Sequence, residues 1–211
     1  MAFGVDHLEA LAECVDLINS GRRISETRAG GARAGGVGRG GRESSNGDRH
    51  EQLASLDDVI AFGRRHRVEN LGAARRSDVR RLRELRARLD AIAVACEGGE
   101  LAAAIRGVNE VLAETGAVPQ IVSHDGRPPH IHVTRASAPL ADRIAAHSAM
   151  SLAELVVAGA GGRVRTCASP LCDAIFVDLS RNQTRRFCDS RTCGNRVHVA
   201  AYRSRRSMAS A

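Results

Sequence analysis

Residues 167–193, CASPLCDAIFVDLSRNQTRRFCDSRTC, decide the fold of the C-terminal part of this 211-residue chain. They contain two close pairs of cysteines, Cys167 with Cys172 and Cys188 with Cys193, separated by a short loop. Each pair can supply two thiolates from one tight turn, as a tetrahedral four-thiolate zinc site requires. Four thiolates leave no open coordination position, so the spacing predicts one structural Zn²⁺ ion. Disulfides, an iron–sulfur cluster or reduced core thiols are the alternatives.

Positive charge is concentrated around the same cysteines. The chain has 31 basic residues, all of them arginine, 24 acidic residues and a net charge of +7. Residues 1–160 contain 21 arginines and 21 acidic residues, whereas residues 161–211 contain ten arginines and three aspartates. A neutral body with a basic end predicts a polyanionic partner, most often nucleic acid. A solvated basic tail is the structural alternative.

The sequence has no feature of a secreted or membrane-spanning protein. Residues 1–21, MAFGVDHLEALAECVDLINSG, have acidic side chains where a signal peptide has a basic segment. No apolar run approaches the roughly 20 residues of a membrane span, so we expect no membrane association. We therefore expect a cytoplasmic protein, in which reduced thiols favour metal binding over disulfides.

Hydrophobic periodicity predicts a mainly helical domain over residues 1–160, called here the helical body. Ser55 is a predicted N-cap, Ser77 and Asp78 mark a second helix start, and Gly98-Gly99 marks that helix's end. The predicted helices cover residues 5–20, 55–66, 77–96, 99–115 and 139–159. In the first of these, the predicted buried stripe consists of Leu8, Leu11, Val15 and Ile18, with Cys14 beside it.

Residues 118–135, VPQIVSHDGRPPHIHVTR, predict a β-hairpin with Asp125-Gly126 at its turn. His130 and His132 would share one strand face, with His124 across from them, where they could bind a metal or carry a proton. No nucleophile–base pair or phosphate-binding loop accompanies these histidines, so we expect no enzyme activity.

Two glycine-rich stretches divide the chain. Residues 28–49 are rich in Gly and Arg and have no apolar face, which predicts a disordered loop, with RNA contact as the alternative. Residues 159–162, GAGG, predict the boundary between the helical body and residues 161–211, called here the finger.

Within the finger we expect a turn at the first cysteine pair, a hairpin, and a helix that begins close to Cys193. The hairpin would pair a strand at 175–177 with a returning strand at 184–187. The apolar sector of the helix would consist of Val197, Ala200, Ala201 and Met208. This order resembles a treble clef. The whole chain is thus predicted to be α+β: a mainly helical N-terminal domain with a β-hairpin, followed by a small treble-clef-like four-cysteine zinc finger. A module of about 45 residues, the size of this finger, cannot fold on apolar burial alone, so we expect zinc binding to contribute to its folding.

The motifs CASPLC, FVDLSRNQTRRFC, CGNR and VHVAAYRSR resemble the bacterial CGNR zinc finger over about residues 163–206. The body, about residues 5–158, resembles the ABATE domain through the sequence LINS at 17–20, the glycine-rich loop and the LRELR helix at 82–86. The resemblance implies a stress-induced transcription regulator whose finger binds DNA. It implies that the zinc ligands are Cys167, Cys172, Cys188 and Cys193.

Basic residues of the same motifs are the candidate nucleic-acid contacts. The arginines would contact phosphates, and Asn195 or an arginine would reach a base edge. Neutralising about five phosphates predicts a slope of roughly −4 to −5 for log affinity against log salt. An interaction module for RNA or an acidic protein is the alternative function. The candidates are Arg181, Arg185, Arg186, Asn195, Arg196 and Arg203.

Overall fold

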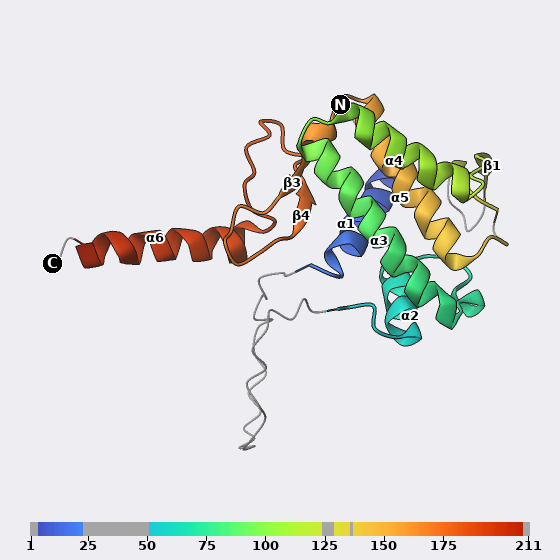
Figure 1. The fold of residues 1–211 in the computed structure, drawn as a ribbon, viewed down its shortest axis with the longest axis horizontal. Helices are drawn as coiled ribbons and strands as arrows, with labels where there is room; N and C mark the ends of the chain where they lie inside the picture. Colours follow the sequence, from blue (N-terminus) through green and yellow to red (C-terminus); the bar gives the residue numbers. More distant parts are fainter. Residues whose placement is uncertain (1–3, 23–50, 124–128, 136, 209–211) are drawn as a thin grey trace, which may run out of the picture.

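The computed structural model describes residues 4–22, 51–123, 129–135 and 137–208 (Figure 1). The Gly/Arg-rich stretch at 28–49, His124 and the predicted Asp125-Gly126 turn lie outside the described residues. The helical body contains α1 (Val5–Asn19), α2 (Leu56–Arg65), η1 (Leu71–Ala73), α3 (Arg76–Glu97), α4 (Leu101–Glu114), β1 (Gln120–Val122), β2 (His130–His132) and α5 (Leu140–Val157). The finger contains η2 (Gly161–Arg163), β3 (Val164–Thr166), β4 (Ile175–Val177), η3 (Ser190–Gly194) and α6 (Asn195–Met208).

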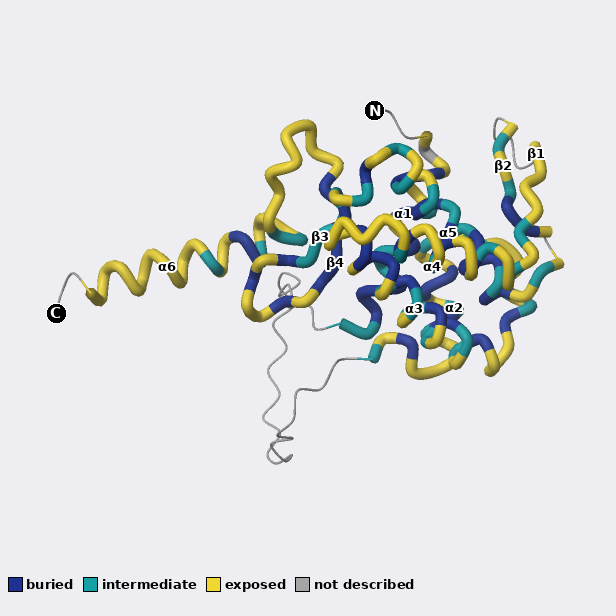
Figure 2. The backbone as a smooth tube through the Cα atoms, turned by 45° about the horizontal axis from the view of Figure 1, so that its top comes forward, coloured by how far each residue is buried: buried dark blue, intermediate teal, exposed yellow. Residues whose placement is uncertain are grey.

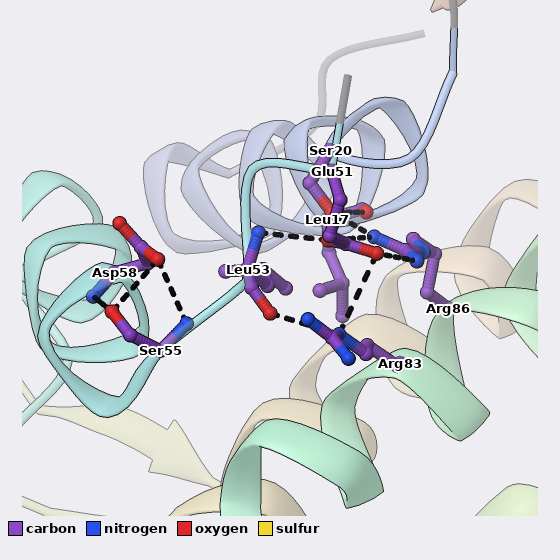
Figure 3. Close-up of polar contacts among 8 residues, drawn as sticks. All are labelled: Leu17, Ser20, Glu51, Leu53, Ser55, Asp58, Arg83 and Arg86. Carbon is purple, nitrogen blue, oxygen red and sulfur yellow. Dashed lines mark hydrogen bonds and ion pairs between the residues drawn. The ribbon is translucent and has the colours of Figure 1, made fainter. Parts of the chain in front are cut away.

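The five helices predicted for the body are confirmed, and local capping explains where two of them begin. Ser55 Oγ accepts a hydrogen bond from Asp58 N at 3.2 Å, and Asp58 Oδ2 accepts one from Ser55 N at 2.8 Å, which makes a capping box (Figure 3). Helix α3 begins at Arg76 instead of the predicted Ser77, because Asp78 Oδ2 accepts a hydrogen bond from Arg75 N at 2.7 Å.

Helices α1, α3, α4 and α5 pack around one aliphatic core. Helix α5 lies at the centre of this packing, and its Leu140, Ile144, Leu152 and Leu155 are each at most 2% exposed. Helices α3 and α4 approach closely at Gly107, where an added Cβ would lie 2.6 Å from Ile92 Cγ1. Glycine at this position therefore permits the short distance between the two helices.

The buried face of α1 differs from the predicted stripe. Cys14 and Leu17 are fully buried, whereas Leu8 is 38% exposed and Val15 is half-buried. The difference arises because α1 contacts both α5 and β4, so its buried face is wider and is centred near Cys14. The predicted packing role of Cys14 is confirmed.

Polar contacts hold the segment that begins at Glu51 against α3 (Figure 3). Arg86 donates to both carboxylate oxygens of Glu51 at 2.9 and 2.7 Å, and Arg83 Nε donates to the Leu53 carbonyl at 2.8 Å. These hydrogen bonds from Arg86 lower the pKa of Glu51 to about 2. Arg80, Arg86 and Arg88 of α3 are thus engaged in ion pairs within the body.

The strands form two separate antiparallel pairs, and one pairing differs from the prediction. Strand β1 pairs with β2, and β3 pairs with β4 so that Arg165 lies opposite Phe176. The predicted returning strand at 184–187 is wrong, because β4 takes its partner from the residues that precede Cys167. The 184–187 segment instead crosses the first cysteine turn, where the Arg186 carbonyl accepts a hydrogen bond from Ala168 N at 2.9 Å.

The β3–β4 hairpin packs into the core of the helical body. Val164 and Ile175 are each 1% exposed and belong to the same buried cluster as α1, α3 and α5. Asn19 Nδ2 donates to the Ile175 carbonyl at 2.9 Å, and Ile175 N donates to Asn19 Oδ1 at 2.8 Å. The finger is therefore joined to the body by apolar packing and by paired hydrogen bonds, while the division of the chain at residue 160 stays a prediction.

The β1–β2 hairpin and the finger lie at opposite ends of the helical body, and α6 projects away from it (Figure 1). None of the helices in the described ranges is both long enough and apolar enough to cross a membrane.

Candidate metal centre

The four cysteines meet in one cluster, with their Sγ atoms all within 4.8 Å of one another. The Cys188 sulfur lies 3.7 Å from that of Cys172 and 3.6 Å from that of Cys193. A tetrahedral site with zinc–sulfur distances of about 2.3 Å has sulfur–sulfur edges of about 3.8 Å. A disulfide would need a sulfur–sulfur distance of about 2.05 Å. The spacing of this cluster therefore fits one zinc ion.

Burial of the sulfurs disfavours their thiolate forms when no cation is bound. Burial raises the pKa of the Cys193 thiol, and burial together with the neighbouring Cys172 raises the pKa of the Cys188 thiol. A coordinated dication removes this penalty because it stabilises the thiolate forms directly. The backbone N–H of Cys188 lies 3.4 Å from the Cys167 sulfur and donates to it.

Two tight turns present the cysteines. In the first turn, Cys172 N donates to the Ser169 carbonyl at 3.1 Å. In the second turn, Asp189 Oδ1 accepts hydrogen bonds from Arg191 N at 2.7 Å and from Thr192 N at 3.0 Å, which opens η3. Helix η3 ends at Gly194, where an added Cβ would lie 3.3 Å from Phe187 Cδ2, so the close approach of the ring favours glycine.

A buried carboxylate organises the loop between the two turns. Asp178 is fully buried, its Oδ1 accepts a hydrogen bond from Ser180 N at 3.0 Å, and its Oδ2 accepts one from Arg185 N at 2.8 Å. Burial alone would raise the pKa of Asp178, but the hydrogen bonds from Ser180 and Arg185 outweigh burial, and the pKa is lowered. Sequence reasoning did not single out Asp178, although its position two residues before Ser180 is typical of a side chain that caps a turn.

Comparisons with known families identify both parts of the chain. Residues 11–159 match the ABATE family model, whose description is "Putative stress-induced transcription regulator". The chain belongs to the ABATE family. Residues 163–206 match the model of the CGNR zinc finger, which agrees with zinc as the ion for the cysteine cluster. No curated protein matches the chain. The family resemblance and the zinc cofactor predicted from the sequence are therefore confirmed.

Helix α6 of the CGNR finger is exposed to solvent over nearly its whole length (Figure 2). Val197 is half-buried, and Met208, at the far end, is 78% exposed. Of the predicted apolar sector of this helix, Val197 is therefore partly covered, whereas Ala200, Ala201 and Met208 are exposed.

The six candidate nucleic-acid contacts are all exposed and fall on two segments of the CGNR finger. Arg181, Arg185 and Arg186 lie in the loop between β4 and η3, whereas Asn195, Arg196 and Arg203 lie on α6. Their contact with DNA stays a prediction.

Arg185 has contacts inside the finger that its neighbours do not share. Its Nε donates to the Phe187 carbonyl at 2.9 Å, and a terminal nitrogen donates to the Cys188 carbonyl. Its guanidinium carbon lies 4.8 Å from the centre of the Phe176 ring, which is a cation–π contact. Arg185 therefore supports the second cysteine turn, and a substitution there alters the fold as well as the surface charge.

The predicted histidine pair lies in the ABATE domain, on one face of β2. His130 Nε2 and His132 Nε2 are 3.1 Å apart, and the His132 ring centre is 6.3 Å from that of His147, a residue the sequence did not single out. The four cysteines form the one set of three or more potential metal ligands found in the described parts of the chain. The histidines therefore do not make a second metal site there.

Proposed function

We propose that this protein is a zinc-dependent DNA-binding transcription regulator whose CGNR finger contacts the phosphate backbone. The observation that carries the proposal is the position of the charge. The whole net charge of +7 falls in residues 161–211, and seven of the ten arginines there lie on the exposed loop before η3 or on the exposed helix α6, which projects away from the neutral helical body. Arginines placed in this way attract a polyanion and pair with phosphates.

Each part of the finger has a distinct proposed role. Cys167, Cys172, Cys188 and Cys193 hold one structural Zn²⁺, and the metal fixes the loop relative to α6. Arg181, Arg186, Arg196 and Arg203 contact phosphates, and Asn195, in the first turn of α6, reaches a base edge. Arg185 acts both as support for the second cysteine turn and as a source of local positive charge.

The proposal includes a cytoplasmic location and no enzyme activity. Four thiolate ligands complete a tetrahedral site, so the zinc would have no position for a substrate or a reactive water molecule. Reduced thiols of this kind persist in the cytoplasm.

DNA binding can be tested by fluorescence anisotropy with a labelled pool of random duplexes and the zinc-loaded full chain. We expect log affinity to fall against log salt with a slope of roughly −4 to −5. Replacing Arg196 and Arg203 with Gln should reduce the magnitude of the slope by about 1.8, because two phosphate contacts are lost. The matched control replaces Arg64 and Arg65, two exposed arginines of α2, and should leave the slope unchanged.

The alternative function, an interaction module for RNA or an acidic protein, is tested in the same assay. Unlabelled duplex DNA, single-stranded RNA and a poly-glutamate peptide are added as competitors at equal charge. Stronger competition by RNA or peptide than by duplex DNA would refute the proposal, and so would a binding curve that a zinc chelator leaves unchanged.

A further inference from the structure

The ABATE domain contains a cavity of about 420 Å³ between α1, α5, β2 and the segment that follows α2. Its volume lies in the range of small-molecule sites, which is about 300–1,000 Å³. The cavity lies away from the cysteine cluster and shares no lining residue with it. Apolar side chains form part of the wall, namely Ala10, Val68, Ile131, Val133, Ile144 and Met150.

Two ionisable side chains are buried in the wall of this cavity, one on helix α5 and one on helix α1. Arg143 of α5 is 6% exposed, and Glu13 of α1 is 4% exposed. Arg143 uses one terminal nitrogen to donate to the Glu69 carbonyl at 2.7 Å. Arg143 Nε and Glu13 Oε1 have no hydrogen-bond partner among the residues that the structure describes. Buried polar atoms are normally satisfied, so these two atoms point to a missing partner.

We propose that this cavity binds a small organic carboxylate, with the ligand's charged group on Arg143 and its apolar part against the aliphatic wall. A carboxylate accepts hydrogen bonds in the planar geometry that a guanidinium offers. The same group can accept a hydrogen bond from a protonated Glu13, so one ligand group would satisfy both buried atoms.

The protonation of the wall agrees with an anionic ligand. Burial raises the pKa of Glu13 to about 8, against the lowering effect of Arg143, so near neutral pH Glu13 is a neutral acid. The other acidic side chains whose charges act on Arg143 are Glu69 and Asp78. Burial lowers the pKa of His147, and His132 and Arg143 lower it further, which favours a neutral imidazole. The other ionisable residues of the wall are Asp6, His7, Glu9, His66, Arg67, Glu69, His130 and Glu154.

The natural distribution of methionines provides a direct test with the zinc-loaded full chain. Met150 lines the cavity, whereas Met208 lies at the exposed end of α6. Protein labelled with ¹³C in its methionine methyl groups is titrated with acetate, hexanoate, benzoate and inorganic phosphate. Benzamide and hexanamide serve as uncharged counterparts, and a Met150→Leu variant assigns the signal.

We expect hexanoate or benzoate to shift the Met150 signal in a saturable way and to leave the Met208 signal in place. The matching amide should bind at least about tenfold more weakly, because it lacks the charge-assisted hydrogen bonds to Arg143. Arg143→Gln should weaken carboxylate binding by a similar factor, while Arg186→Gln, a change in the finger, should have no effect.

Several results would overturn the proposal. It fails if no carboxylate moves the Met150 signal, or if an amide binds as tightly as its acid. A response to phosphate alone would refute the assignment of a carboxylate. The comparison of acid with amide uses the unaltered chain, so it tests carboxylate selectivity even if the Arg143→Gln variant does not fold. DNA binding is not measured, so the result is independent of the proposed function.

Discussion

Replacing Asn19 with Ala should weaken the contact between the finger and the helical body. Asn19 lies at the C-terminal end of α1 and is 9% exposed. Its side-chain amide both accepts a hydrogen bond from Ile175 N, at 2.8 Å, and donates one to the Ile175 carbonyl, at 2.9 Å. The substitution removes both hydrogen bonds while leaving the apolar contacts of Ile175 in place.

The structure gives the size of the expected effect. Ile175 is 1% exposed, so its N–H and C=O would both be buried without a partner in the variant. Each buried unsatisfied group costs about 1–3 kcal/mol, which gives a range of roughly 2–6 kcal/mol for the pair. Asn19 is close enough to the surface for a water molecule to restore part of the loss, so we expect about 3 kcal/mol.

Urea denaturation of the zinc-loaded chain measures the loss of stability, and hydrogen exchange at the Ile175 amide locates it. About 3 kcal/mol corresponds to exchange that is roughly 100-fold faster at this amide. The matched control is Glu97→Ala, which removes the exposed hydrogen bonds to Thr166 N and Oγ1 in the same contact region and should cost below about 1 kcal/mol. If Asn19→Ala destabilises the chain no more than Glu97→Ala does, the proposed paired contact is not what holds the finger.

Three further predictions concern the metal, the cavity and the loop. Removing zinc with a chelator should unfold the finger while much of the helical signal in circular dichroism remains, since α1 to α5 have their own core; loss of the whole signal would contradict this. Because the pKa of Glu13 is raised from 4.5 to about 8, the folded chain keeps a proton that the unfolded chain has lost, so stability should fall as pH rises between these values. In Glu13→Gln this pH-dependent loss of unfolding free energy, which reaches about 5 kcal/mol by pH 9, should be absent. Urea midpoints with the same pH dependence in the variant as in the unaltered chain would refute this role of Glu13. Asp178→Ala should cost about 2–4 kcal/mol in urea denaturation, because the Ser180 and Arg185 amides lose a charged acceptor, and an unchanged midpoint would refute its role in the loop.

Local sequence patterns were sufficient to predict the helices of the body and the cysteine cluster. The body helices have strong apolar periodicity, and Ser55 is the N-cap of α2, as predicted. The cysteine cluster was predictable for a similar reason, since two close pairs place four thiols within reach of one ion whatever the route of the loop.

Long-range pairing was not predictable from the same signals. Strand β4 has only three residues, and the sequence on both sides of it can supply an antiparallel partner. The choice of β3 depends on Val164 and Ile175 reaching the core of the body, which no local pattern encodes. The cavity was missed because its wall combines residues from α1, β2 and α5, far apart in the sequence, and because Arg143 resembles any other arginine until its burial is known.

Zinc binding and the contact of Ile175 with the body stabilise the finger by different amounts, and they determine different parts of its structure. A structural zinc site contributes about 10–16 kcal/mol to the folding of a small module, whereas burying one side chain such as Ile175 contributes about 1.5–3 kcal/mol. Zinc therefore dominates the internal fold of the finger and sets the loop with Arg181 and Arg186 relative to α6. The smaller contribution from Ile175 and its hydrogen bonds to Asn19 acts between finger and body, so it sets the direction in which α6 leaves the body. Loss of zinc should therefore abolish DNA binding outright, while loss of the Asn19 contact should leave a folded finger whose arginines still bind phosphates.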